Sequence, residues 1–218
     1  MLNQKRERVM LNILINSHLL KFTKKNVFFI SLALLSLLFS ACTVTPQGSS
    51  KDDALITPVV KESYIDAISA MKSGDLNKAQ TLLNKLILKN PNISNAHVNL
   101  AIIYIQQKLI DKAKISLEHA LKLNPNNVYA LNQLGIIHRK NGDFSASKNA
   151  YEKAINIESD YSLAYLNLGI LYDLYLYDLQ NAIQHYKKYQ ELTKSQDKKV
   201  EKWIIDLERR QKKPLALK

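Results

Sequence analysis

The sequence predicts an all-α protein, built as a solenoid of helix–turn–helix repeats, and three observations predict this class. The stretch LAYLNLGILY (163–172) is matched 34 residues upstream by YALNQLGIIH (129–138) and 34 residues earlier by NAHVNLAIIY (95–104), with a faint fourth copy from Lys61. A fixed period of this size indicates a repeat protein. Each repeat holds two apolar stretches with helical spacing. Gly and Pro number only 5 each among 218 residues, which is few for an all-β chain.

Residues 1–41 are predicted to be an export signal. Residues 27–41 read VFFISLALLSLLFSA, carry no charge and follow three nearby lysines. A basic region before a short apolar core describes a secretory signal peptide. The core of 15 residues is short for a membrane-spanning helix, which needs about 20. Translation from Met1 and translation from Met10 both fit this interpretation.

The signal ends in Phe39-Ser40-Ala41-Cys42, which resembles the lipoprotein box of bacterial lipoproteins, where two small residues precede an invariant cysteine. The resemblance implies that the Cys42 sulfur takes a diacylglycerol, that the signal is cut before Cys42, and that palmitate or a similar acyl chain is added to the new amino group. Cys42 is the single cysteine of the sequence and falls at the position that the box requires. Phe39 stands where leucine is usual, so an ordinary signal peptide and an uncleaved anchor stay open as alternatives.

Residue 43 and the segment after it indicate where in the cell the lipid-anchored protein would lie. Members of the lipoprotein family that stay in the inner membrane tend to have Asp after the cysteine, so Thr43 implies the outer membrane of a Gram-negative bacterium, with the protein facing the periplasm. Residues 42–59 are polar at first, contain Pro, Gly and Ser, and are expected to form a flexible tether. A coil of about 16 residues spans roughly 20–25 Å, so the folded part would lie close to the membrane.

The solenoid is expected to contain four repeats. Their predicted bounds are 60–93, 94–127, 128–161 and 162–196. Small residues recur at equivalent positions of the first helices, namely Ala67, Ala101, Gly135 and Gly169. Two helices approach to about 8 Å only where side chains are small, so these positions predict close contacts within each helix pair. Asn90-Pro91 and Asn124-Pro125 are expected to end second helices, because proline cannot continue a helix.

Large residues such as Tyr104, Tyr151 and Tyr172 are expected to fill the space beside the small ones. This pattern resembles the tetratricopeptide repeat family over residues 60–196. The resemblance implies a right-handed α-solenoid of about four repeats. The sequence departs from the family at Asp66, where leucine is expected, and at Ser159, where proline is expected. The fourth repeat has one extra residue, so its turn near Tyr175 to Asp178 should differ from the others.

Residues 197–210 are expected to form a C-terminal capping helix, and residues 211–218 a basic tail. Val200, Trp203, Ile204 and Leu207 recur at helical spacing among polar residues. A terminal repeat needs such a helix to cover a core that would otherwise be exposed. Trp203 is therefore expected to be a core residue rather than a ligand platform.

Net charge and side-chain chemistry argue against nucleic acid and against catalysis. The formal net charge is +12, but residues 1–41 hold six basic residues and one acidic residue, and residues 194–218 hold nine and four. The repeats are nearly neutral, so no nucleic-acid partner is expected. The histidines lack metal-ligand spacing, and we find no phosphate loop or serine-nucleophile motif. We therefore expect no enzyme, no cofactor and no metal site.

In this family the first helices line a concave groove that receives a peptide or a helix of a partner. Carried over by position, the predicted groove residues are Tyr64, Asn99, Ile102, Tyr129, Gln133, Ile136, Arg139, Lys140, Asn167 and Ile170. Amide side chains both donate and accept, so Asn99, Gln133 and Asn167 are suited to pair with a peptide backbone. The alternative is that these amides are solvated or bond neighbouring helices. Arg139 and Lys140 are suited to meet a carboxylate, and a solvated basic pair is the alternative.

Tetratricopeptide lipoproteins of Gram-negative bacteria resemble this layout, which implies a lipid-anchored scaffold that binds an envelope protein or peptide. Some relatives assist type IV pilus assembly, some hold peptidoglycan hydrolases, and some accompany TonB-type systems. The NLGILYDLYL and WIIDLERR segments weakly favour a resemblance to the last group. A second hypothesis is an envelope-surface binder that uses its basic C-terminal end, residues 198–218, on anionic lipid or peptidoglycan. Deleting that end separates the two, because only the surface binder should lose its ligand and show strong salt sensitivity.

Overall fold

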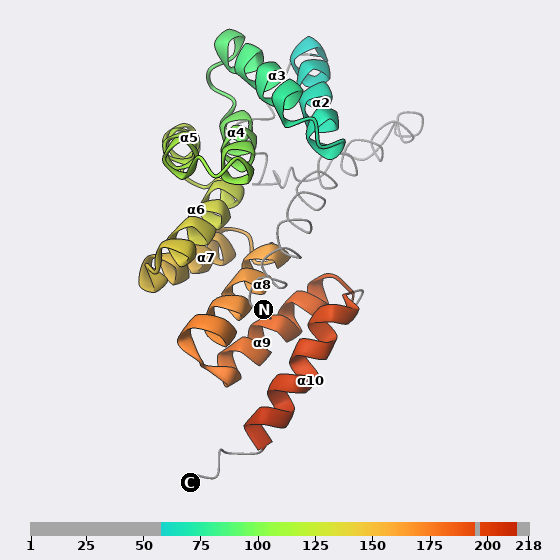
Figure 1. Cartoon of the computed structure of the whole chain (residues 1–218), viewed down its shortest axis with the longest axis vertical. Helices are drawn as coiled ribbons and strands as arrows, with labels where there is room; N and C mark the ends of the chain where they lie inside the picture. The colour runs from blue at the N-terminus through green and yellow to red at the C-terminus, as the bar shows by residue number, and fades with distance from the viewer. Residues whose placement is uncertain (1–57, 195–196, 213–218) are drawn as a thin grey trace, which may run out of the picture. The chain divides into compact units, whose positions relative to one another are not determined.

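The computed structural model describes residues 58–194 and 197–212, and these residues form helices joined by short turns (Figure 1). The predicted signal peptide, Cys42 and nearly all of the tether lie outside the described residues, as does most of the basic tail. The helices are α2 (Pro58–Lys72), α3 (Leu76–Lys89), α4 (Ser94–Gln106), α5 (Ile110–Leu123), α6 (Val128–Asn141), α7 (Phe144–Ile157), α8 (Ser162–Leu171), the π-helix η2 (Tyr172–Leu176), α9 (Leu179–Leu192) and α10 (Lys198–Lys212).

The predicted all-α repeat solenoid is confirmed. The chain divides into two compact units at Ala96 and His97, within the first turn of α4, and each unit is described by itself. The assignment of residues to a signal, a tether, repeats and a tail stays a prediction. Within the described residues, no helix is long and apolar enough to cross a membrane.

In the first unit, α2 packs against α3 through small and aliphatic side chains. Ala67 on α2 and Ala79 and Leu83 on α3 are fully buried. The turn between the helices uses Gly74 in the left-handed region, with φ +81°. The Asp75 side chain then accepts a hydrogen bond of 3.0 Å from the backbone N–H of Lys78, which caps the first turn of α3.

In the second unit, the close contacts predicted from small residues are present. A Cβ added at Gly135 of α6 would lie 2.7 Å from Cδ1 of Tyr151 on α7, and one added at Gly169 of α8 would lie 2.6 Å from Cδ1 of Tyr186 on α9. The buried Ser147 hydroxyl donates a 2.8 Å hydrogen bond to the backbone oxygen of Gly135. Each aromatic ring therefore fills the space that its facing glycine leaves open.

The turn inside each helix pair contains one residue with positive φ. Gly74, Lys108 and Gly142 follow one another at intervals of 34 residues, and Tyr177 comes 35 residues after Gly142. Glycine adopts this conformation without steric cost, whereas a residue with a Cβ is strained there by roughly 1–2 kcal/mol. The second and fourth repeats therefore carry a local strain that the first and third do not.

The second helices end where the sequence predicts, whether or not a proline follows. α3 and α5 end before Asn90 and Asn124, whose backbone N–H groups bond to Leu86 and Ala120. α7 ends before Glu158 with the same kind of bond, to Ala154, although Ser159 replaces proline. The hydroxyl of Tyr165 donates a 3.1 Å hydrogen bond to the backbone oxygen of Ser159. Proline is therefore not needed to end this helix.

The extra residue of the fourth repeat is accommodated by the π-helix η2, which directly continues α8. A π-turn closes its hydrogen bonds between residues five apart, so it takes in one residue more than an α-turn. The helix ends at Leu176, and the next residue, Tyr177, has a φ of +55° and an exposed side chain. The prediction that this turn differs from the other three is confirmed.

The last helix, α10, packs on α9 as a cap (Figure 1). Val200 and Leu207 are fully buried, whereas Trp203 is only partly buried and contacts the Tyr186 ring at 5.6 Å between centroids. The Asp197 side chain accepts from the backbone N–H of Lys199 at 2.9 Å and so caps the helix start. The cap thus covers the end of the core of the fourth helix pair.

Candidate partner-binding site

The ten predicted groove residues lie on the first helices of the pairs. Tyr64 lies on α2 of the first unit, and the others lie on α4, α6 and α8 of the second. Lys140 is exposed and Tyr129 partly exposed, while the other eight side chains are buried. A partner can contact the exposed side chains directly, but it can bind the buried side chains only after the residues that cover them move. The buried and the exposed residues of this set therefore need separate tests. No residue in this set is shown to bind a partner, and the groove stays a prediction.

The structure brings two amides together across α6 and α8. The Asn167 Nδ2 donates a 2.8 Å hydrogen bond to Oδ1 of Asn132, and both side chains are fully buried. The alternative that these amides bond neighbouring helices therefore holds for Asn167. Asn99, on α4, is also fully buried and Gln133 nearly so.

Asn132 was missed by the sequence analysis. It stands where Val98 and Leu166 stand in the neighbouring repeats, and both of those side chains are fully buried. A polar residue at a position that is apolar in the other repeats is the signal that would have found it. Burying an amide there is unfavourable unless its polar atoms are bonded.

The amide pair leaves one donor and one acceptor unused. Within the described part of the chain, Nδ2 of Asn132 and Oδ1 of Asn167 have no hydrogen-bond partner. Leaving a buried polar atom unsatisfied costs roughly 1–3 kcal/mol. A peptide group, with one C=O and one N–H, offers the two complementary atoms.

Arg139 and Lys140 do not form a solvated basic pair. The guanidinium of Arg139 is 5.8 Å from the Tyr175 ring centroid, and its side chain is only 2% exposed. Tyr175 in turn contacts the Phe144 ring at 5.2 Å. Arg139 therefore links α6 to η2 as a buried cation over an aromatic ring, whereas the neighbouring Lys140 faces solvent.

Tyr129 connects α6 to the residue just before α8. Its ring meets the ring of Tyr161 edge-on, at 5.4 Å between centroids and an interplanar angle of 85°. Burial raises the pKa of the Tyr161 hydroxyl well above its usual value, since the charged form is poorly solvated there. Tyr161 is therefore neutral at physiological pH and serves packing rather than acid–base chemistry.

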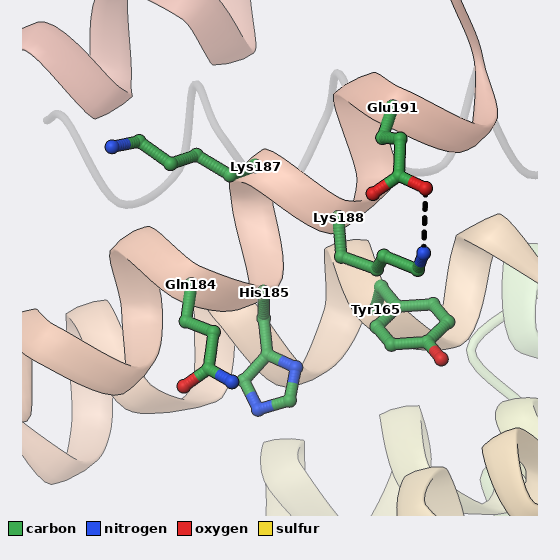
Figure 2. Close-up of a pocket in the computed structure, with 6 residues that line it drawn as sticks. All are labelled: Tyr165, Gln184, His185, Lys187, Lys188 and Glu191. Atoms are coloured by element: carbon green, nitrogen blue, oxygen red, sulfur yellow. Dashed lines mark hydrogen bonds and ion pairs between the residues drawn. The ribbon is translucent and has the colours of Figure 1, made fainter.

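A second feature of the fourth repeat is an open hollow of about 460 Å³ between α8 and α9. Figure 2 shows the side chains that line it: Tyr165, Gln184, His185, Lys187, Lys188 and Glu191. Lys188 and Glu191, which lie three residues apart on α9, form a 2.7 Å ion pair beside it. The hollow is open to solvent, so we assign it no chemistry.

His185 is the histidine of this hollow. Its ring stacks on Tyr172, with 5.5 Å between centroids and an interplanar angle of 3°. Burial lowers its pKa below the usual value, and the charge of Lys148 adds to this, while Asp178 acts in the opposite direction. Among the described residues, no group of three or more His, Cys, Asp or Glu side chains is placed to hold a metal ion.

Comparison with known proteins agrees with this architecture. Two family models described as "Tetratricopeptide repeat" match residues 70–134 and 128–161. No curated protein matches the chain in sequence. Repeats of this kind generally form surfaces that bind other proteins.

Three solved structures illustrate the similarity in fold. PilF of Pseudomonas aeruginosa matches with a TM-score of 0.64 at 18% identity, over 74% of this chain and 71% of its own. A thermophilic tetratricopeptide-repeat protein of Thermus thermophilus matches with a TM-score of 0.60 at 20% identity, over 68% and 80%. A mutant O-GlcNAc transferase of Thermobaculum terrenum matches with a TM-score of 0.56 at 19% identity, over 66% of this chain but 27% of its own. At these identities the matches show the fold alone.

Proposed function

Because the chain is a tetratricopeptide-repeat protein, we propose that it is a non-enzymatic scaffold that binds another protein or peptide along the first helices of its repeats. The observation that carries this proposal is the amide pair of Asn132 and Asn167. Its unused donor and acceptor match one peptide group, and both atoms belong to first helices. Both side chains are fully buried, so the partner has to displace the side chains that cover them before it can pair with them. Recognition of a peptide backbone would tolerate different side chains in the partner.

The scaffold is lipid-anchored in this proposal. Cys42 carries the acyl chains, the outer membrane holds the anchor, and the repeats face the periplasm of a Gram-negative bacterium. The support is the sequence Phe39-Ser40-Ala41-Cys42 after a basic and apolar leader. The partner is therefore an envelope protein, with pilus assembly, peptidoglycan hydrolysis and TonB-type systems as the candidate pathways. Stable anchoring requires two or more acyl chains, each contributing roughly 0.8 kcal/mol per buried methylene.

The experiment is a comparison of cross-linked partners in intact cells. The protein carries a C-terminal tag, and mass spectrometry identifies what is captured with the wild type, with Asn132→Leu, and with an Asn99→Ala, Asn167→Ala double variant. Asn132→Leu places there the leucine of the fourth repeat, Leu166, so it removes the amide while keeping the branching and number of heavy atoms of the side chain. We expect one envelope protein with the wild type and its loss with both variants.

Matched controls separate the groove from the rest of the surface. An Asn77→Ala, Asn84→Ala variant removes two exposed amides from the second helix α3 and should retain the partner. A Tyr129→Ala, Lys140→Ala variant tests the accessible groove members. Cys42→Ser should lose lipid labelling and membrane association. If Asn132→Leu and the Asn99→Ala, Asn167→Ala double variant both capture the same proteins as the wild type, the groove amides are structural and the proposed groove is wrong.

A further inference from the structure

The outward side of α10 carries a row of cations with one apolar residue in its middle. Val200 and Leu207 are buried on the side that packs on α9. The opposite side holds residues spaced by four, three, four and three positions, which places them in one line along an α-helix. This basic row consists of Lys198, Lys202, Ile205, Arg209 and Lys212, and all five are exposed. Ile205 is 58% exposed.

The cations of the basic row are mostly not neutralised by the chain. Within residues 197–212 and the rest of the described chain, no ion pair involves Lys198, Lys202 or Lys212, and Arg209 pairs with Asp206 at 2.6 Å. The acidic Glu208 is bound instead by Lys187 of α9 at 2.7 Å, which lowers the pKa of its carboxyl. The charge of Lys212 also lowers the pKa of the Glu208 carboxyl, so Arg209 and Lys212 each have a carboxylate nearby. Lys198 and Lys202 have no ion-pair partner among the described residues.

We propose that the basic row of α10 docks on an anionic lipid surface. Lysine and arginine head groups meet the phosphates of the lipids, and Ile205 enters the boundary between head groups and acyl chains. The proposal rests on the lipid anchor of the proposed function, because a tethered domain meets the membrane at high effective concentration. A few charges then suffice for docking that would be weak for an untethered protein.

The composition of the row favours lipid over a protein partner. Lysine is depleted in the cores of protein interfaces, which are formed by aromatic and aliphatic side chains. The basic row has one aliphatic residue and three lysines. Docking on an acidic protein is the competing outcome, and the experiment separates the two.

The chain contains a built-in probe, since Trp203 is its single tryptophan and lies on α10. The full-length acylated protein is reconstituted into vesicles of phosphatidylcholine, with or without phosphatidylglycerol, that contain a trace of dansyl-labelled lipid. Energy transfer from Trp203 to the dansyl group reports the distance of α10 from the surface. We expect transfer to increase when phosphatidylglycerol is present and to fall at high salt, because salt screens exposed charges.

Substitutions test the basic row directly. Lys198→Gln, Lys202→Gln, Arg209→Gln should lower the transfer in phosphatidylglycerol vesicles to the level seen with phosphatidylcholine alone, and Ile205→Asn should reduce it partly. The control is Lys112→Gln, Lys114→Gln, Lys122→Gln, which removes three exposed cations spread around α5. Glutamine and lysine have similar helix propensities, so circular dichroism should show unchanged helicity in both variants.

The outcomes distinguish failure of the docking from failure of the anchor. A protein that does not float with vesicles of either composition lacks the anchor, which overturns the lipid-anchoring proposal and with it this inference. A protein that floats but shows equal transfer with both compositions overturns the docking alone. If the triple variant keeps its energy transfer but loses a captured protein, the basic row binds an acidic protein partner, and the lipid proposal is wrong.

Discussion

Replacing Gly135 by alanine would place a Cβ in space that the Tyr151 ring already fills. The added atom would lie 2.7 Å from Cδ1 and 2.8 Å from Cζ of that ring, below the 3.4 Å of ordinary contact. Tyr151 is fully buried, so its ring has no solvent to move into. Because the overlap is severe, overpacking should cost the upper part of the usual range, roughly 2–3 kcal/mol, and the higher helix propensity of alanine returns about 1 kcal/mol. We expect Gly135→Ala to lower the free energy of unfolding by about 1–2 kcal/mol.

The first two repeats solve the same packing problem with other residues. Ala67 and Leu83 occupy the equivalent positions in the first repeat, and Ala101 and Leu117 those in the second; all four are fully buried. Tyr151→Leu alone should leave a cavity that costs roughly 2 kcal/mol or more. Gly135→Ala with Tyr151→Leu recreates the combination of the earlier repeats, so we expect the double variant to be more stable than the sum of its parts by at least about 1 kcal/mol.

Urea denaturation followed by circular dichroism measures the four free energies of this cycle. Tyr151→Phe is the control for the hydroxyl, since it keeps the ring that meets Gly135. A neutral Gly135→Ala variant, or strictly additive effects in the double variant, would show that the ring and the glycine are not a packing pair. The reasoning on helix contacts would then be wrong.

Two further predictions concern backbone strain and pH. Tyr177→Gly should raise the free energy of unfolding by roughly 0.5–1 kcal/mol because glycine adopts a positive φ without strain. Lys108→Gly should have the same effect in the second repeat. Urea denaturation measures both, and a loss of stability in both variants would contradict the strain argument. The pKa of His185 is lowered by burial, so between its unfolded and folded pKa values the unfolded chain binds a proton that the folded chain does not. Stability should therefore fall as the pH drops below about 6.5, and His185→Gln should show a smaller fall; an identical pH dependence of the two urea midpoints would exclude this role for His185.

Part of the candidate site followed from the 34-residue period, and part did not. The period placed Asn99, Gln133 and Asn167 at equivalent positions of first helices, and the structure has them on α4, α6 and α8. The same period gave no warning that Asn167 bonds Asn132, since the bond joins residues 35 apart, at different positions of their repeats. Which side chains meet across two helices depends on the crossing geometry, and sequence spacing alone does not supply it.

Arg139 shows the same limit. Its place beside Lys140 suggested a basic pair, although the equivalent residue of the second repeat, Ile105, is apolar and buried. The ring that covers its guanidinium belongs to Tyr175 in η2, a segment whose conformation depends on the extra residue of the fourth repeat. The sequence indicated that this turn differs, but the π-helix that results is set by packing of α8 and η2 against α9.

By itself, the sequence determined the helices of this protein, their order and their ends. Helical hydrogen bonds join residues four apart, so apolar spacing, caps such as Asp75 and breaks such as Asn90-Pro91 act over short stretches of chain. The tertiary structure decided the rest: the glycine–tyrosine packing pairs, the amide bond between α6 and α8, and the solvent-facing row of cations on α10. These features depend on which faces are covered, and a face is covered only when distant parts of the chain come together and exclude water.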